Sequence, residues 1–169
     1  PVIRIFAGRE DKKTDRAAAF DRAVAGIREA CDYAGSRGVF LAIENHGYLT
    51  ETADDVLRIL DTVNHEWLGV NLDTGNFHGD PYANMAQLAP KALNVQVKAA
   101  VNVDGKKGEA DFARIAGILR DAGYRGYVAL EYEEALDGLV AFLETDHDAD
   151  PLTAVPPMLD KLRAALRSV

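Results

Sequence analysis

Residues 69–76 read Gly-Val-Asn-Leu-Asp-Thr-Gly-Asn, and this short stretch decides between two α/β folds. Successive side chains of a β-strand point to opposite faces, so Val70 and Leu72 share one face while Asn71 and Asp73 share the other. The first face is aliphatic, as expected beneath a layer of helices. The second is polar and becomes charged where the strand ends, and burying that charge under a second layer of helices would be costly unless it were paired.

Four further runs show the same two-faced pattern, at 2–8, 39–44, 93–98 and 127–132. Their aliphatic faces consist of Ile3, Ile5, Val39, Leu41, Ile43, Val95, Val97, Val128 and Leu130. Their other faces carry Arg4, Phe6, Phe40, Ala42, Glu44, Asn94, Gln96, Lys98, Ala129, Glu131 and Glu133. A doubly wound sheet would bury both faces under helices, whereas a (β/α)8 TIM barrel has an interior that opens at the C-terminal ends of its strands. The pattern therefore favours the TIM barrel.

Amphipathic segments between and after these runs predict helices at 14–37, 52–63, 81–88, 110–122 and 157–166. We find no hairpin signal between the strands, so the alternation predicts parallel strands joined by helical crossovers. A complete barrel has eight strand–helix units and about 250 residues. With five units, residues 1–169 are expected to form a single domain that is the C-terminal portion of a barrel, about strands 4 to 8. The missing strands would belong to the same protein or to another chain.

One segment departs from this alternation. Residues 134–150 are less regular and acidic towards their end, which predicts an inserted loop, either a surface excursion or a lid over a site.

Composition excludes several classes of function. The 169 residues are 48% hydrophobic, and 27 acidic against 19 basic residues give a net charge of −8. An acidic chain disfavours nucleic-acid and membrane partners, and no apolar run reaches the length of about 18 residues that spans a membrane. Cys31 is the only cysteine, which excludes an intrachain disulfide and a multi-cysteine zinc site. A reducing, cytoplasmic setting is therefore expected.

Four inward-facing side chains from four consecutive strands form the candidate site. They are Glu44, Asp73, Gln96 and Glu131. Three carboxylates that face one cavity repel each other unless something neutralises them, and a divalent cation is the simplest neutraliser. An oxygen-rich set with one amide suits Mn²⁺ or Mg²⁺ better than Zn²⁺. The alternative is a buried ion network in which the carboxylates pair with Arg4 and Lys98.

Three motifs carry a resemblance to a known family: Ile-Glu-Asn-His at 43–46, Leu-Asp-Thr-Gly-Asn at 72–76 and Leu-Glu-Tyr-Glu at 130–133. They resemble the xylose isomerase-like TIM barrels, a family of sugar phosphate isomerases and epimerases. Ketose 3-epimerases, hydroxypyruvate isomerase and inosose dehydratases belong to it. The resemblance covers essentially the whole chain, as the fourth to eighth strand–helix units of the family.

The resemblance implies that the metal ligands are Glu44, Asp73, Gln96 and Glu131. Gln96 stands where the family usually has His, although hydroxypyruvate isomerase-like members are similar in using Gln. The bound metal would chelate the carbonyl and adjacent hydroxyl of a ketose or aldose. Glu44 and Glu131 would then move a proton through an ene-diolate.

Four other residues are candidates for contact with the substrate. Lys98 is expected to stabilise the oxyanion or donate a proton, or else to pair with Glu131 or Glu133. His46 is expected to bind sugar hydroxyls from a loop at the rim. Arg4 is expected either to bind a phosphate or carboxylate or to form an interior salt bridge. Asn76 occupies a substrate-binding position where relatives often have His.

The leading functional prediction is a metal-dependent isomerase or epimerase of a free or phosphorylated sugar. A lyase or dehydratase acting on a keto-sugar or inosose is the nearest rival, and a non-catalytic sugar-binding scaffold subunit is a prediction of another class. The endonuclease branch of the superfamily is disfavoured, because it uses a zinc cluster with several His ligands. The expected partners are a small-molecule sugar and either a homo-oligomer or the missing barrel strands.

Overall fold

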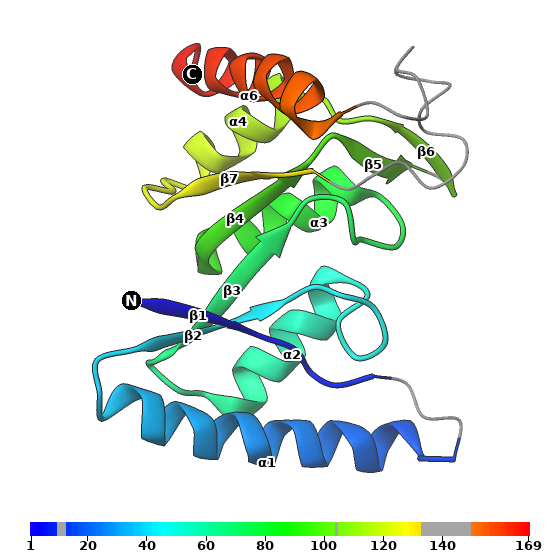
Figure 1. Ribbon diagram of the computed structural model, residues 1–169. Helices are drawn as coiled ribbons and strands as arrows, with labels where there is room; N and C mark the ends of the chain where they lie inside the picture. The colour runs from blue at the N-terminus through cyan, green and yellow to red at the C-terminus, as the bar shows by residue number, and fades with distance from the viewer. Residues whose placement is uncertain (10–12, 104, 133–149) are drawn as a thin grey trace.

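The computed structural model describes residues 1–9, 13–103, 105–132 and 150–169 (Figure 1). Five parallel strands form one sheet in the order β1-β2-β3-β4-β7. They are β1 Val2–Ile5, β2 Phe40–Glu44, β3 Leu68–Asp73, β4 Ala92–Lys98 and β7 Val128–Glu131. All neighbouring strands pair in parallel, so the prediction of a partial barrel is confirmed.

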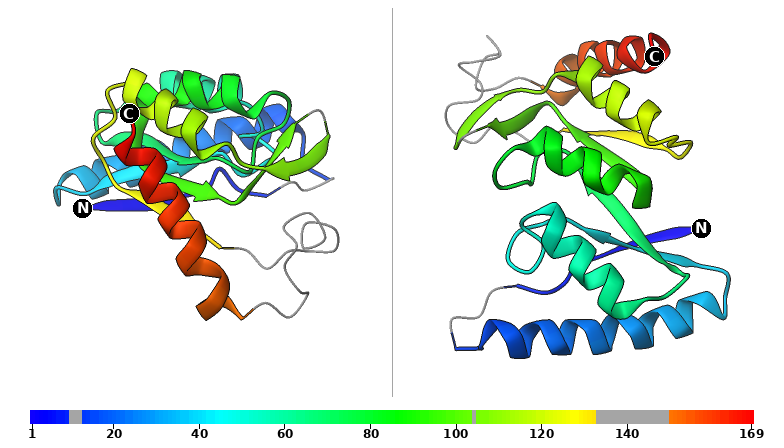
Figure 2. Two further views of the ribbon diagram at one scale, coloured as in Figure 1. Left: turned by 90° about the horizontal axis from the view of Figure 1, so that it is seen from above. Right: turned by 180° about the vertical axis from the view of Figure 1, so that it is seen from behind.

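The main helices follow one another in chain order along the outside of this sheet (Figures 1 and 2). They are α1 Arg16–Gly35, α2 Ala53–Val63, α3 Pro81–Leu88, α4 Phe112–Asp121 and α6 Pro151–Arg167, with a short 3₁₀ turn at Ala89–Lys91. The first turn of each is capped by a side-chain oxygen that accepts a backbone N–H bond. The caps are Asp15, Thr52, Asp80, Asp111 and Asp150.

The start of α6 corrects a prediction. The sequence predicts this helix at 157–166, starting at Pro157, and proline is common at the first helical position. The structure begins the helix at Pro151, which has the same proline signal together with the side-chain cap of Asp150, and it carries Pro156 and Pro157 inside the helix.

The core lies between the helices and the aliphatic face of the strands. Ile43, Val70 and Val95 are fully buried there, as the alternation predicted. Ile3 is the exception, because 54% of it is exposed although the pattern placed it on the helix-covered face. It lies on β1, which is an outer strand of the described sheet, whereas the strands between β1 and β7 are flanked on both sides.

A hairpin contradicts the prediction that helices alone connect the strands. β5 (Ala100–Val103) and β6 (Lys106–Glu109) pair antiparallel directly after β4. Asp-Gly at 104–105 is a typical sequence of a two-residue hairpin turn, and Gly105 has a φ of 76°. The signal was missed because the second strand, Lys-Lys-Gly-Glu, shows no alternation of apolar and polar residues.

The two remaining predictions concern the insertion at 134–150 and the absence of a membrane-spanning segment. Apart from Asp150, the insertion predicted at 134–150 lies outside the described residues, as does Glu133. Within the described part of the chain, no helix is both long and apolar enough to cross a membrane.

Candidate functional site

The register of the sheet brings the candidate residues to one edge. Asp73 lies opposite Gln96 on the neighbouring strand, and Lys98 lies opposite Glu131. All four belong to the last three residues of their strands, on the face that does not meet the helices. The predicted gathering of polar groups at the C-terminal ends of the strands is thus what the structure shows.

Asp73 is the most deeply buried carboxylate of the group. Its Oδ1 accepts a hydrogen bond from the Gly75 backbone N–H at 2.8 Å. Its Oδ2 is buried and has no hydrogen-bond donor among the described residues. The Asp73 carboxyl group lies within hydrogen-bonding reach of Glu131, so two groups that both accept when ionised face each other.

Burial is the largest single influence on the pKa of each of the three carboxylates. It raises the pKa of Asp73 to about 8, although the charge of Lys98 and the Gly75 N–H both favour the ionised form. Burial also raises the pKa of Glu44, against the opposing charge of Arg4. For Glu131, burial acts in the same direction, but hydrogen bonding to Asp73 and the charge of Lys98 outweigh it and lower the pKa. Asp73 therefore stays ionised at neutral pH only if more positive charge comes close.

Lys98 lies between two of the carboxylates. Its Nζ is 3.5 Å from Asp73 Oδ2 and 3.8 Å from Glu131 Oε2, and it donates to Asn76 Oδ1 at 3.0 Å. The pairing with Glu131 is one of the alternatives predicted for this lysine. The pairing with Asp73 belongs to the ion network that was the alternative to a metal site.

Arg4 forms a salt bridge with Glu44, the remaining carboxylate. Its Nη1 is 3.0 Å from Glu44 Oε2, which confirms the salt bridge that was one of two expectations for Arg4. The arginine is not enclosed, since 44% of its side chain is exposed and its guanidinium lies 4.9 Å from the ring centroid of Phe6. It remains accessible to a ligand from the open side of the sheet.

Asn76 and His46 lie at the rim of this cluster. Asn76 Nδ2 donates to Glu44 Oε1 at 3.3 Å, so Asn76 connects Glu44 with Lys98. The largely exposed His46 packs edge-on against Phe6 at 5.1 Å, with its Nε2 4.0 Å from Glu44 Oε1. His46 thus occupies the rim position expected from the sequence.

Asn45 holds the end of β3 in place. It is fully buried, its Nδ2 donates to the Asp73 backbone O at 2.8 Å, and its Oδ1 accepts from the Asp73 N–H at 2.9 Å. From the sequence, Asn45 had no expected role beyond its place in a motif. Its position directly after the strand-ending Glu44 is the signal from which such a clamp could have been suspected.

Gly75 leaves room for Lys98 to reach the carboxylates. A Cβ at this position would lie 2.6 Å from Lys98 Cδ and 3.0 Å from the Ala100 backbone O. Gly75→Ala is therefore expected to displace Lys98 and to lower the free energy of unfolding by about 1–3 kcal/mol in urea titrations. Gly117→Ala is the control, because it adds the same methyl group in open space on α4 and is expected to stabilise the fold. Equal stability of both variants would contradict the close approach of Lys98.

The donor set fits a divalent cation in its chemistry. Over the described ranges, no three His, Cys, Asp or Glu side chains converge closely enough to form a metal centre as they stand. The carboxylates are instead drawn towards Arg4 and Lys98, as the ion-network alternative predicted. Nevertheless, Asp73 Oδ2 is a buried oxygen that accepts no hydrogen bond from any described residue and faces a second carboxylate, and oxygen ligands of this kind suit Mn²⁺ or Mg²⁺.

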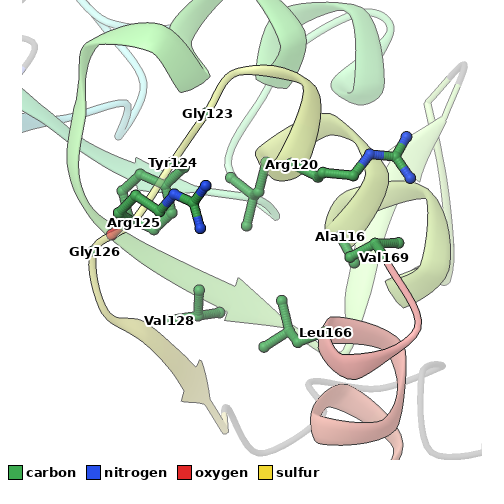
Figure 3. A pocket seen from close by; sticks show the side chains of 10 residues that line it. Ala116, Arg120, Gly123, Tyr124, Arg125, Gly126, Val128, Leu166 and Val169 are labelled. Atoms are coloured by element: carbon green, nitrogen blue, oxygen red, sulfur yellow. The ribbon is translucent and has the colours of Figure 1, made fainter.

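A hollow of about 310 Å³ lies at the end of β7 opposite to Glu131 (Figure 3). Its lining includes Tyr124, Arg125 and Val128 before and at the start of the strand, and Leu166 from α6. None of the candidate site residues lines it. This hollow and the candidate site therefore lie at opposite ends of β7.

Comparison with protein families decides how this half-barrel is classified. Residues 1–154 match the family described as xylose isomerase-like TIM barrel. The chain belongs to this family. No match was found among the sequences of curated proteins. Membership of the xylose isomerase-like family agrees with the resemblance drawn from the three sequence motifs.

Solved structures share the fold at low sequence identity. D-psicose 3-epimerase from Clostridium cellulolyticum H10, solved with D-tagatose, has a TM-score of 0.73 and 23% identity over 93% of this chain and 60% of its own. 3-keto-D-glucoside 4-epimerase from E. coli has a TM-score of 0.70 and 15% identity, over 96% of this chain and 63% of its own. AP endonuclease family 2 from Brucella melitensis has a TM-score of 0.61 and 22% identity, over 72% of this chain and 51% of its own. This xylose isomerase-like chain thus spans about three fifths of the length of the two epimerases.

Proposed function

We propose that this chain carries the metal-binding and proton-transferring residues of a divalent-metal-dependent sugar or sugar phosphate isomerase or epimerase. The observation that supports the proposal is the buried Asp73 Oδ2, which has no hydrogen-bond donor among the described residues and faces Glu131 at the C-terminal ends of the strands. The solved structures that share the fold include two sugar epimerases. Because the chain covers about three fifths of each, three further barrel strands from the same protein or a partner subunit belong to the proposal.

Four side chains would hold the metal, which we take to be Mn²⁺ or Mg²⁺. They are Glu44, Asp73, Gln96 and Glu131. When bound, the cation would act as a Lewis acid that acidifies the C–H bond beside a sugar carbonyl. Lys98 would yield its place beside Asp73 and Glu131, remaining near enough to stabilise an oxyanion or donate a proton.

The chain's own residues would carry out the proton transfers. Both glutamates are candidates for the base: burial raises the pKa of Glu44, which strengthens its carboxylate as a proton acceptor, whereas the pKa of Glu131 is lowered because its hydrogen bond with Asp73 and the charge of Lys98 outweigh burial. They lie on β2 and β7, with β3 and β4 between them, so they can approach a sugar from two sides. His46 and Asn76 would bind hydroxyl groups, and the half-exposed Arg4 would bind a hydroxyl or an anionic group of the substrate.

Two alternatives remain on the same site. A lyase or dehydratase would use the same proton abstraction and then expel a β-oxygen substituent. A non-catalytic sugar-binding scaffold is favoured by the ion pairs of Arg4 and Lys98, since these already neutralise part of the acidic cluster.

Metal binding separates the proposal from the scaffold. We expect about one Mn²⁺ per chain by electron paramagnetic resonance, and an affinity at least about tenfold weaker in Glu131→Gln, which keeps the side-chain shape but removes a carboxylate. Glu66→Gln removes the same charge at an exposed position before β3 and is expected to leave Mn²⁺ binding unchanged. A folded protein that binds no Mn²⁺ would contradict the proposal and leave the scaffold as the better account. Where Mn²⁺ binds, ketoses and keto-sugars are the substrates to screen.

A further inference from the structure

We propose that Asn71 is a positioning residue that sets the direction of two candidate metal ligands, Glu44 and Gln96, and that Asn94 in turn orients Asn71. The metal-binding part of this inference rests on the proposed function. Neither asparagine was assigned a role from the sequence, although both fall on the polar face of their strands.

Asn71 lies at the centre of the acidic cluster, on the middle strand β3. It pairs in register with Glu44 on β2 and with Asn94 on β4, and it is 2% exposed. Its Nδ2 donates to Glu44 Oε2 at 3.1 Å and also to Gln96 Oε1. Its Oδ1 accepts a hydrogen bond from Asn94 Nδ2 at 2.7 Å.

These partners allow only one orientation of the Asn71 amide. An ionised Glu44 carboxylate can only accept, so the NH₂ group of Asn71 must face it. If the amide were turned over, its oxygen would face the Glu44 carboxylate and its NH₂ would face the NH₂ of Asn94. Both contacts would be repulsive. Asn94 therefore contributes by favouring the orientation that serves Glu44.

The same reasoning extends to Gln96. Its Oε1 accepts from Asn71 and, at 3.4 Å, from the Arg4 guanidinium, which can only donate. Its Nε2 donates to Glu131 Oε2 at 2.9 Å. The amides thus form a directional series from Asn94 through Asn71 and Gln96 to Glu131. Hydrogen bonds that hold a metal ligand from behind fix its direction, and their loss weakens metal binding.

The first test needs no metal. Asn71→Leu and Asn94→Leu preserve side-chain volume while removing the amide. In ¹⁵N-labelled protein, both variants are expected to shift the Gln96 side-chain amide resonances and to speed their hydrogen exchange. A Gln96 amide that is unchanged in both variants would overturn the inference, whatever the protein does with Mn²⁺. Asn94 is only half-buried, so Asn94→Leu keeps the test available if Asn71→Leu does not fold.

The second test measures Mn²⁺ affinity. Asn71→Leu is expected to weaken it about 10–100-fold, and Asn94→Leu less. Because Asn94 acts through Asn71, adding Asn94→Leu to Asn71→Leu is expected to cost nothing further. Fully additive losses would overturn the relay from Asn94, and unchanged affinity in Asn71→Leu would overturn the role of Asn71.

A control separates positioning from general destabilisation. Asn84 lies on α3, where its Oδ1 accepts from the Ala53 backbone N–H at 2.6 Å. Asn84→Ala is expected to lower the melting temperature and leave Mn²⁺ affinity unchanged, and equal weakening of Mn²⁺ by this variant would overturn the inference. If the wild-type protein binds no Mn²⁺ but the Gln96 amide responds as expected, the proposed function fails while the positioning role stands.

Discussion

Asp73→Asn is expected to weaken Mn²⁺ binding by at least about 100-fold and to abolish turnover of any sugar substrate. Even the loss of a residue that only hydrogen-bonds to a metal ligand weakens metal affinity about 10–100-fold. The carboxylate is fully buried, and no residue in the described part of the chain donates a hydrogen bond to its Oδ2. In the variant, the amide oxygen can keep the bond from the Gly75 N–H, while the new NH₂ group replaces Oδ2. That group would face Lys98 Nζ, 3.5 Å away in the present arrangement, with one donor against another. Isothermal titration with Mn²⁺ is the measurement.

A matched variant keeps this result interpretable. Asp61→Asn removes the same charge from an exposed position on α2 and is expected to leave Mn²⁺ affinity unchanged. Asp73→Asn itself is expected to fold, because an amide in a buried position costs less than a charge. If Asp73→Asn binds Mn²⁺ as tightly as the wild-type protein, Asp73 is not a ligand and the acidic cluster serves the ion pairs alone.

The alternation along single strands was enough to predict where the polar side chains gather. Asn71 and Asp73 lie two residues apart, so they share a face whatever the rest of the chain does. The same rule placed Glu44, Gln96 and Glu131 on the inner face, and the parallel register then aligned their strand ends. The face to which a strand residue points depends only on its position along the strand, so the sequence alone predicts it.

The contacts within the site could not be predicted in the same way. Lys98 on β4 pairs with Asp73 on the neighbouring strand β3. Gly75 permits this pairing because it has no Cβ, which would otherwise clash with the lysine side chain. The clamp formed by Asn45 likewise joins residues 28 positions apart. Such contacts depend on how neighbouring strands stagger and on side-chain rotamers, which periodicity does not determine.

Asn45→Leu is expected to produce the largest loss of stability, about 2–6 kcal/mol from the free energy of unfolding. Leucine fills a similar volume but leaves the backbone N–H and C=O of Asp73 without their partners, and each buried group without a partner costs about 1–3 kcal/mol. Since small domains are stable by only about 5–15 kcal/mol, the loss would be a large share of the total. Urea denaturation followed by circular dichroism measures it.

Asn45→Asp divides this effect into its two hydrogen bonds. The carboxylate can still accept from the Asp73 N–H but can no longer donate to the Asp73 carbonyl, and it adds a negative charge beside the acidic cluster. At pH values where the introduced carboxyl group is protonated, Asn45→Asp is expected to lose less stability than Asn45→Leu, because the protonated acid can donate to the Asp73 carbonyl again. Among the described residues, the Asn94 amide bonds only to the side chain of Asn71, so Asn94→Leu is expected to cost less stability than either Asn45 variant. A loss below about 1 kcal/mol in Asn45→Leu would mean that water replaces both bonds, and that β2 and β3 do not need this clamp to present Asp73.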